Sequence, residues 1–466
     1  MAQTSIFFPS AARMHVGSPF TERGNKMSKL ADFFHFSDRG TSMKVELIAG
    51  LTTFMTMAYV LIVQPTAMVG TEAALTDASG LVLTKQSFVV VVSLISGLIT
   101  ILMGLYSNMP FALSTGMGSN FLLGGMIQAG TITFSQAMGI ILVEGVIFLV
   151  LSILGVRDLI VRIIPKNIKI SISTAIGFFI AYLGFKNTGL ATFNGGLGMG
   201  DFKSPAVILA LIGLAIIALL TAYKVKGAIL IGIIVTTIIG IPMGVTTVPS
   251  TFAALPDFTE VGNVVMKLDV THIWTAEGIV LIFIAFFGDF FSTLGTVLGL
   301  GQRCGWLDEN GNLPGIEKPF LIDAIGTCVG AIFGCTTVTT YVESSAGVEA
   351  GGRTGLTAVT TGILFLIAMF FAPAVLMIPD AATGPALIFV GFIMVKGFKD
   401  IDFSDFTEAF GPFVMIMFTV FMGSMATGIA AGILAHVFIK VCTGHAKEIH
   451  PAMYILCIPL ALYFVM

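Results

Sequence analysis

Hydrophobic residues occur along this chain in long runs, and short groups of Gly, Pro, Asn and charged residues separate the runs. Apolar runs of about 20 residues have the length of a helix that crosses the hydrocarbon core of a bilayer. The pattern predicts an all-α polytopic membrane protein with fourteen segments, of which the third and the tenth are weak as ordinary helices. The predicted segments are 46–69, 87–107, 110–129, 134–156, 167–186, 204–222, 227–247, 276–301, 319–335, 336–350, 355–379, 383–397, 406–422 and 424–441.

The charged residues between these segments predict the orientation of the chain, because cytoplasmic loops carry an excess of Lys and Arg. With the N-terminus in the cytoplasm, the loop at 248–275 lies outside and is acidic. We therefore predict a multi-pass protein of the cell (plasma) membrane with both termini in the cytoplasm. The basic residues that this orientation places inside, after the fourth, sixth and twelfth segments, are Arg157, Arg162, Lys166, Lys169, Lys224, Lys226, Lys396 and Lys399.

The fourteen segments divide into two sequential halves of seven. Because seven is odd, the halves must have opposite orientations in the membrane, which is the inverted-repeat plan of many secondary transporters. We expect residues 1–26, ahead of the start-like stretch MSKLADFF, to be a disordered extension or the product of an upstream start codon. The predicted divisions are a cytoplasmic N-terminal segment 1–45, a first seven-span repeat 46–247, an extracellular loop 248–275, a second seven-span repeat 276–441 and a C-terminal interfacial segment 442–466.

The third segment of each half contains a stretch that favours extended backbone: FAL within residues 108–125, and TTVTTYV within residues 334–352. Extended backbone inside a bilayer is tolerated only where protein or a cavity satisfies its polar groups. Matching positions in the two halves predict a binding site near the midplane, where the two stretches pair. For Gly116 and Gly118 a second interpretation stays open, in which they only allow close helix packing. Phe111, beside the first stretch, is a candidate for stacking on a planar ligand.

Composition restricts the class of protein. The chain is 56% hydrophobic and 11% charged, with a mean hydropathy of +0.99, which is typical of polytopic membrane proteins. A net charge of -3 gives no sign of a nucleic-acid partner. HExxH, Walker A and GxSxG signatures are absent, so we expect neither an enzyme nor a primary pump. The five cysteines lack CxxC spacing, which predicts no disulfide, no metal site and no cofactor.

Asp289 lies near the middle of an apolar segment with no basic residue nearby. A carboxylate at the bilayer centre costs about 2.5 to 3.5 kcal/mol on insertion scales, so it should face a cavity or a partner. Thr293 and Thr296 follow at i+4 and i+7 on the same helix face, with Ser292 beside them. This polar stripe is predicted to face inward.

Glu343 follows the extended stretch of the tenth segment, which predicts a carboxylate at a helix N-terminus that can accept donors from a ligand or exchange a proton. Glu144 is a third intramembrane carboxylate, and for it a packing role and a transport role stay open. His436 is interpreted as a packing histidine. Glu349 and Arg353 are interpreted as a structural ion pair.

Four stretches resemble the AzgA-like guanine, hypoxanthine and adenine permeases of the nucleobase:cation symporter superfamily. They are FFGDFFSTLGTVLGLG, TTVTTYVESSAGVEAGGRTGLTAV, PFALSTGMGSN and AGLTTFMTMAYVLIVQP, and the resemblance covers nearly the whole chain from Met27 onward. It implies two inverted seven-span repeats arranged as a core domain and a gate domain, with the third and tenth segments meeting as short antiparallel strands. It also implies proton-coupled uptake of purine bases, which offer N–H donors and a π-face.

Carried over by position, the resemblance implies that Asp289 and Glu343 hold the base and take part in proton coupling. The sequence departs from the family pattern at Ser292, where a second acid is common, and at Thr115, where a proline is common. The predicted substrate-binding residues are Glu343, Asp289, Tyr341, Asn120, Gly116, Gly118, Ser292, Thr293 and Phe111.

Alternatives to purine–proton symport remain open at this point. The same fold could carry another nucleobase, such as xanthine or uracil, or a small anion, or the chain could be an uncoupled channel-like protein. Acidic residues at the predicted site argue against an anion. Sodium in place of the proton and pairing of two copies as a homodimer also remain open.

Overall fold

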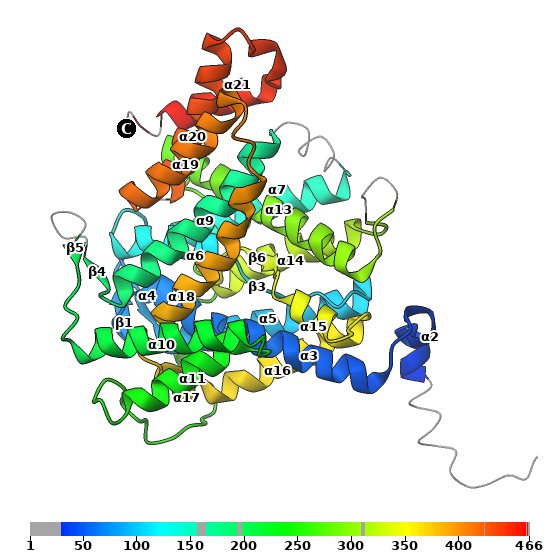
Figure 1. The fold of residues 1–466 in the computed structure, drawn as a ribbon, viewed down its shortest axis with the longest axis vertical. Helices are drawn as coiled ribbons and strands as arrows, with labels where there is room; N and C mark the ends of the chain where they lie inside the picture. The colour runs from blue at the N-terminus through cyan, green and yellow to red at the C-terminus, as the bar shows by residue number, and fades with distance from the viewer. Residues whose placement is uncertain are drawn as a thin grey trace, which may run out of the picture.

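The computed structural model describes residues 29–155, 165–192, 198–308, 313–423, 425–462 and 464. The prediction for residues 1–26 lies outside this part of the chain. The described chain is almost entirely helical, and two short strands lie near the centre of the molecule (Figure 1). Among the described residues, eight helices are long and apolar enough to cross a bilayer, and α11, α19, α20 and α21 are shorter apolar helices.

The first half of the chain supplies seven of the predicted segments. Its first segment is divided at residues 58–59 into two helices, and its third begins as a strand. The elements are α3 (Met43–Met57) with α4 (Val60–Val69), α5 (Lys85–Ser107), β3 (Leu113–Thr115) with α6 (Met117–Gln128), α7 (Phe134–Ile153), α9 (Lys166–Asn187), α10 (Pro205–Ala222) and α11 (Ala228–Gly240).

The second half follows the same plan, and again its third segment begins as a strand. The elements are α13 (Ala276–Cys304), α14 (Glu317–Phe333), β6 (Val338–Thr340) with α15 (Ser344–Glu349), α16 (Gly355–Ala368) with η1 (Met369–Phe371) and α17 (Ala372–Leu376), α18 (Asp380–Val395) with η2 (Lys396–Asp400), α19 (Phe406–Met422) and α20 (Met425–Cys442).

Short elements lie between and beyond these segments. The ends of two loops form the antiparallel hairpins β1–β2 and β4–β5. The short elements are α2 (Phe36–Arg39), β1 (Ala74–Thr76), β2 (Val82–Thr84), β4 (Ala191–Thr192), β5 (Gly198–Met199), α12 (Phe258–Val261), η3 (Ala446–Glu448) and α21 (Pro451–Leu462).

The predicted fourteen segments agree with these elements, with differences at several ends. The seventh segment was expected over 227–247, but α11 ends at Gly240. Pro242 follows, and Gly244 has a φ of 71°, so the backbone leaves the helix at this point. The twelfth segment begins at Asp380, three residues before the expected start at 383.

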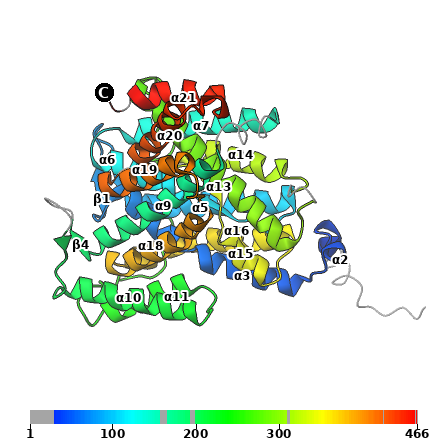
Figure 2. The same cartoon turned by 45° about the horizontal axis from the view of Figure 1, so that its top comes forward.

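The membrane helices pack as two groups. In one group, α5 contacts α4, α14 and α16, while α3 contacts α15 and α16, and α7 contacts α13 and α14. In the other, α9 contacts α18 and α19, α10 contacts α11 and α18, and α19 contacts α20. Figure 2 shows α10 and α11 beside α18 at the lower edge, with α3, α15 and α16 together to the right. We call these groups the core (α3–α7 and α13–α17) and the gate (α9–α11 and α18–α20).

A buried carboxylate ties the two halves of the core together at one end. Glu46 of α3 accepts hydrogen bonds from the backbone N–H groups of Arg353, Thr354 and Thr357, and from the Thr357 hydroxyl at 2.6 Å. These donors lie at and before the first turn of α16, where backbone N–H groups have no partner within the helix. Glu46, in the first segment, therefore caps the N-terminus of the eleventh segment.

The expected ion pair between Glu349 and Arg353 does not form. Glu349 instead contacts Arg303 at the end of α13, and Arg353 donates to the carbonyl oxygens of Val348 and Gly352. The turn at residues 350–352 breaks the helix that i, i+4 pairing requires, and Gly351 has a φ of 103°. All five cysteines are free.

Candidate substrate-binding site

The third and tenth segments meet as antiparallel strands. β3 pairs with β6 in the register Leu113↔Thr340, Ser114↔Thr339 and Thr115↔Val338. Two further bonds extend the pairing, from Gly116 N–H to the Thr337 carbonyl at 2.7 Å and from Tyr341 N–H to the Ala112 carbonyl at 2.9 Å. The extended backbone is thus satisfied within the protein, as the bilayer requires. This confirms the predicted strand pairing.

Gly116 stands where β3 turns into α6, and its lack of a side chain permits the close approach of β6. A Cβ at Gly116 would lie 2.6 Å from the Thr337 hydroxyl oxygen, too near for two non-bonded atoms. The first turn of α6 then begins at Met117, so the positive end of this helix dipole lies at the strand pair.

A cavity of about 840 Å³ lies beside the strand pair, between core and gate. Core elements α6, β6 and α13 line it on one side, and gate helices α9 and α18 line it on the other. It extends to Lys166, the first residue of α9, and to Asp400, the last residue of η2. Six of the nine predicted binding residues line it: Glu343, Asp289, Tyr341, Ser292, Gly116 and Gly118.

The other three predicted residues lie outside the cavity lining. The Asn120 amide accepts a hydrogen bond from the Thr336 hydroxyl at 2.5 Å and donates to the Thr115 hydroxyl at 3.1 Å, so it fastens α6 to the strands. Thr293 contacts Asp323 and the Thr339 hydroxyl. Phe111 is buried, with its ring 6.4 Å from that of Trp306. These three residues therefore support the site from behind its lining.

Glu343 directly precedes α15 and is positioned by the first segment. Its carboxylate accepts a hydrogen bond from the Tyr59 hydroxyl at 2.8 Å, and its backbone carbonyl accepts one from Thr56 at 3.3 Å. Tyr59 lies at the break between α3 and α4 and also lines the cavity. Sequence reasoning missed Tyr59, although a polar aromatic residue shortly before Pro65 in an apolar segment was a visible signal.

One carboxylate oxygen of Asp289 accepts a hydrogen bond, and the other is available to a ligand or a proton. It is 3% exposed, and its Oδ2 accepts a hydrogen bond from Thr327 of α14 at 3.3 Å. Its Oδ1 has no hydrogen-bond partner among the described residues. Ser292 and Thr296 line the cavity with Asp289, so most of the predicted polar stripe does face inward.

Asp323 of α14 is a buried carboxylate that sequence reasoning also missed. Its Oδ2 accepts hydrogen bonds from the Thr293 hydroxyl and from the backbone and hydroxyl of Thr340. It therefore joins α13, α14 and β6. The signal was present in the apolar stretch PFLIDAIG, because an acid in such a stretch needs donors or a partner.

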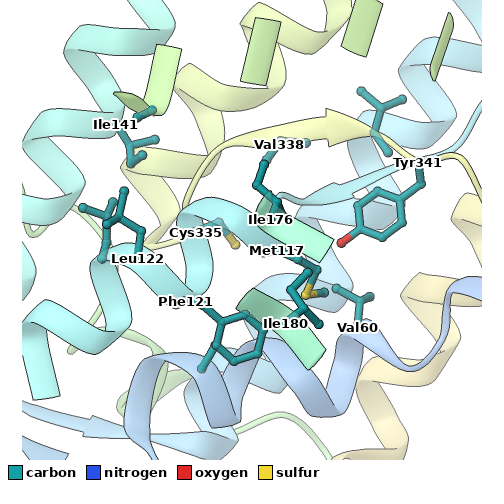
Figure 3. Packing of buried hydrophobic residues seen from close by; sticks show 14 of the residues in the cluster. Val60, Met117, Phe121, Leu122, Ile141, Ile176, Ile180, Cys335, Val338 and Tyr341 are labelled. Atoms are coloured by element: carbon teal, nitrogen blue, oxygen red, sulfur yellow. The ribbon is translucent and has the colours of Figure 1, made fainter. Parts of the chain in front are cut away.

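The remaining wall of the site is apolar. Tyr341 donates its hydroxyl hydrogen to the Thr115 carbonyl at 2.5 Å, which fixes the ring beside the strands. Figure 3 shows Tyr341 together with Val338 of β6, Met117 of α6 and Ile176 of α9 in one cluster of buried residues. An apolar cavity with a few converging polar groups is the usual form of a small-molecule site.

Two crossing segments that are part strand and part helix, beside a cavity between two helix groups, define the class of the protein as an integral membrane transporter. Solved structures share this fold. The transmembrane domain of the cyanobacterial bicarbonate transporter BicA matches with a TM-score of 0.59 at 14% identity, over 84% of this chain and 97% of that chain. Murine Slc26a9, an anion transporter solved in the inward-facing state, matches with a TM-score of 0.61 at 13% identity, over 95% and 77%. The shared fold consists of two inverted seven-span repeats, as predicted.

The chain belongs to the Permease family, whose Xan_ur_permease model matches residues 44–442. The putative permease MJ0326 of Methanocaldococcus jannaschii is 38% identical over 94% of this chain and 99% of its own length. Adenine permease AdeQ of Escherichia coli is 34% identical over 95% and 97%. Guanine/hypoxanthine permease PbuO of Bacillus subtilis is 35% identical over 91% and 98%. The resemblance to nucleobase permeases is confirmed, and the relatives are transporters, not enzymes.

Proposed function

We propose that this protein imports the purine bases hypoxanthine, guanine and adenine across the plasma membrane by proton symport. One observation carries the proposal: Glu343 of the tenth segment and Asp289 of the eighth line one cavity beside the strand pair. The names of the relatives, which include adenine and guanine/hypoxanthine permeases, support the choice of purines.

The chemistry of a purine fits this cavity. A purine presents neighbouring N–H donors, and a carboxylate accepts such donors in pairs. In our proposal Glu343, held by Tyr59, accepts from the base, and Asp289 contributes its unpartnered Oδ1. The apolar wall that includes Ile176 and Phe291 covers the flat faces of the ring system.

We further propose that transport proceeds by alternating access. The cavity is lined by both core and gate, so movement of one group against the other would open and close it. In the predicted orientation Lys166 and Asp400 lie at the cytoplasmic side, and the cavity reaches both residues. The described conformation is then inward-facing, and an outward-facing partner conformation completes the cycle.

Uptake of radiolabelled hypoxanthine into cells that lack their own purine uptake tests the proposal. We expect accumulation against the gradient, collapse of accumulation with a protonophore, and no effect when sodium is replaced. Unlabelled guanine and adenine should compete more strongly than xanthine or uracil. Competition by xanthine or uracil alone would indicate that the substrate is another nucleobase. Uptake that stops at equal concentrations and does not respond to the protonophore would indicate an uncoupled pathway.

A small anion is the remaining alternative cargo. The likeness to bicarbonate and anion transporters is a likeness of fold at 13–14% identity. The carboxylates of Glu343 and Asp289 in the cavity lining repel an anion. Lys166, the first residue of α9, lies at the end of the cavity beside Asp400 rather than among these carboxylates. Absence of hypoxanthine uptake together with uptake of labelled bicarbonate or sulfate would reverse this choice.

A further inference from the structure

Three buried carboxyl groups from three core helices gather next to the strand pair. Glu144 of α7 and Asp323 of α14 are 0% exposed, and Asp289 of α13 is 3% exposed. The Glu144 and Asp289 carboxyl groups lie within hydrogen-bonding reach of each other, and Asp323 is close enough to both for electrostatic interaction. We call these three residues the carboxyl cluster.

The carboxyl cluster contains four oxygen atoms without a donor. Both oxygens of Glu144, Oδ1 of Asp289 and Oδ1 of Asp323 have no hydrogen-bond partner among the described residues. None of the ion pairs found in that part of the chain involves these residues. Adjacent buried carboxylates without a counter-charge cannot all ionise. A bound proton supplies both the missing donor and the missing positive charge.

The donors are distributed unevenly over the carboxyl cluster. Asp323 accepts through Oδ2 from Thr293 and from both donors of Thr340, so its role is to join helices and strand. Asp289 accepts through Oδ2 from the Thr327 hydroxyl at 3.3 Å, and the Thr339 hydroxyl also lies within hydrogen-bonding reach of its carboxyl group. Glu144 accepts a hydrogen bond from no described group, and its carboxyl group lies within reach of a carboxyl–carboxyl hydrogen bond to Asp289 that itself contains a proton.

Few other titratable groups lie around Glu144 and Asp289. α7 packs against α6, α13 and α14. α6 carries no titratable side chain, α13 contributes Asp289, and α14 contributes Asp323 and Cys328, whose thiol is near Glu144. Across the cavity the lining includes Tyr59, Tyr341, Glu343 and, at its end, Lys166. Among the described residues, then, no cation contacts Glu144 or Asp289.

We propose that Glu144 and Asp289 form a single proton-binding pair that carries the coupled proton, with Asp323 as its positioning residue. The inference rests on the proposed proton symport. The pair alternates between two protons and one: the O–H bond on Asp289, which lines the cavity, breaks, and its proton passes to cavity water. The proton that remains is shared between Glu144 and Asp289, so the pair is never fully ionised. Reloading from the outside reverses the step.

Glu144→Gln tests this pair, because an amide of the same shape cannot take part in proton exchange. In proteoliposomes we expect the variant to retain hypoxanthine counterflow, which moves no net proton, and to lose accumulation driven by a pH gradient. Its hypoxanthine affinity should also lose the pH dependence seen in the wild type. Ser152→Ala is a matched control, because Ser152 lies on the same helix and its hydroxyl also lacks a described partner. This control should retain both activities.

Failure of this inference is distinguishable from failure of the proposed function. Wild-type protein that neither binds nor transports hypoxanthine contradicts the proposed function. Wild-type activity together with normal, pH-sensitive accumulation by Glu144→Gln overturns the proton-binding pair. Wild-type accumulation that is driven by sodium and insensitive to pH contradicts the proposed proton symport itself.

Infrared difference spectroscopy covers the case in which Glu144→Gln does not fold. Spectra of wild-type protein with and without hypoxanthine should show a change in the carbonyl stretch of a protonated carboxylic acid. Isotope exchange into D₂O should shift this band, which identifies it as an acid. Absence of any such band would count against a protonated pair in the transport cycle.

Discussion

Tyr59 shows how one hydroxyl group can determine the geometry of a binding site. It donates to the Glu343 carboxylate at 2.8 Å and is itself 1% exposed, so it fixes the direction of that carboxylate in the cavity. A side chain held in place loses less entropy when a ligand binds. Tyr59 is therefore a positioning residue for Glu343.

We predict that Tyr59→Phe weakens hypoxanthine binding roughly 10-fold or more, because a hydrogen bond to a charged group contributes about 1.5 to 3 kcal/mol. Binding is measured by competition with radiolabelled hypoxanthine in membranes. Tyr106→Phe, at an exposed position near the end of α5, is the control and should bind normally. An unchanged affinity in Tyr59→Phe would show that Glu343 does not need this donor.

For Glu343 itself we predict that Glu343→Gln abolishes or severely reduces uptake, because the amide replaces one of the two acceptor oxygens of the carboxylate with an NH2 donor. Membrane insertion should be intact, which quantification of the protein in isolated membranes checks. Asp289→Asn is expected to reduce uptake as well. Normal transport by both variants would disprove the assignment of the two acids.

Analysis of the sequence identified the acidic residues that lie next to recognisable motifs. It missed site residues that no such motif marks. Asp289 and Glu343 stand in a polar stripe and at a strand–helix junction, which are visible in a linear sequence. Asp323 and Tyr59 act through contacts with residues far along the chain, Thr293 and Glu343. Such contacts depend on helix packing, which hydrophobic periodicity does not specify.

At the scale of single elements, the β3–α6 junction depends on the absence of a side chain at Gly116. We predict that Gly116→Ala lowers the melting temperature and reduces uptake, because overpacking of a tight contact costs about 1 to 3 kcal/mol. Melting is measured by fluorescence-detected size exclusion after heating. Gly125→Ala, within α6, is the matched control, since nothing lies within 4 Å of its Cβ position. Equal melting temperatures for the two variants would contradict this account.

The β1–β2 hairpin is held to α7 by Asp77, which accepts hydrogen bonds from the backbone N–H groups of Ser79, Leu81 and Phe134. Burial opposes ionisation of this carboxyl group, but hydrogen bonds from Ser79, Phe134 and Leu81 outweigh it and lower its pKa below the ordinary 3.8. A group whose pKa is lower in the folded state stabilises the protein above its unfolded pKa, and this stabilisation disappears as the pH falls through the folded pKa.

We therefore predict that acidification below about pH 4 lowers the melting temperature of the wild type, and that Asp77→Asn removes part of this dependence. Melting curves of both proteins across a pH series measure the effect. Parallel curves for wild type and Asp77→Asn would mean that other carboxyl groups account for the loss.

Among the elements, the sequence predicted the strand pair and the positions of the helices. Helix-breaking residues and the lengths of apolar runs are local properties of the sequence. It did not predict the early end of α11, the division of the eleventh segment into α16, η1 and α17, or the extension of the twelfth segment by η2. Those ends depend on which backbone groups find partners in neighbouring helices. Thr246, beyond α11, is buried against Gly240, for example.

At the scale of the whole molecule, transport by alternating access requires the core and the gate to move relative to each other. α3 of the core and the start of α11 in the gate come close at Met55 and Gly227, where a Cβ built on Gly227 would lie 3.1 Å from the Met55 Cβ. Disulfides join Cβ atoms about 3.5 to 4.5 Å apart, so a small adjustment brings two cysteines into range.

We predict that oxidation of the double variant Met55→Cys/Gly227→Cys arrests uptake and that a reducing agent restores it. The single variants are controls for the strain of a side chain at Gly227, whose φ is 71°, and Cys442→Ser removes an exposed thiol from the background. Uptake of hypoxanthine before and after oxidation is the measurement. Full uptake with the cross-link complete would show that these two helices do not separate during the cycle.

The β3–β6 pair also has a consequence for how the protein is made. The Tyr341 hydroxyl and the Thr115 carbonyl that it contacts are 226 residues apart along the chain, so the first half enters the membrane long before its partner strand is synthesised. Until then the polar backbone of residues 113–115 must be shielded by water, by lipid head groups or by an assembly factor. Completion of the tenth segment is thus the step that commits the newly made chain to its native form, and a chain truncated before it would be left for proteolysis.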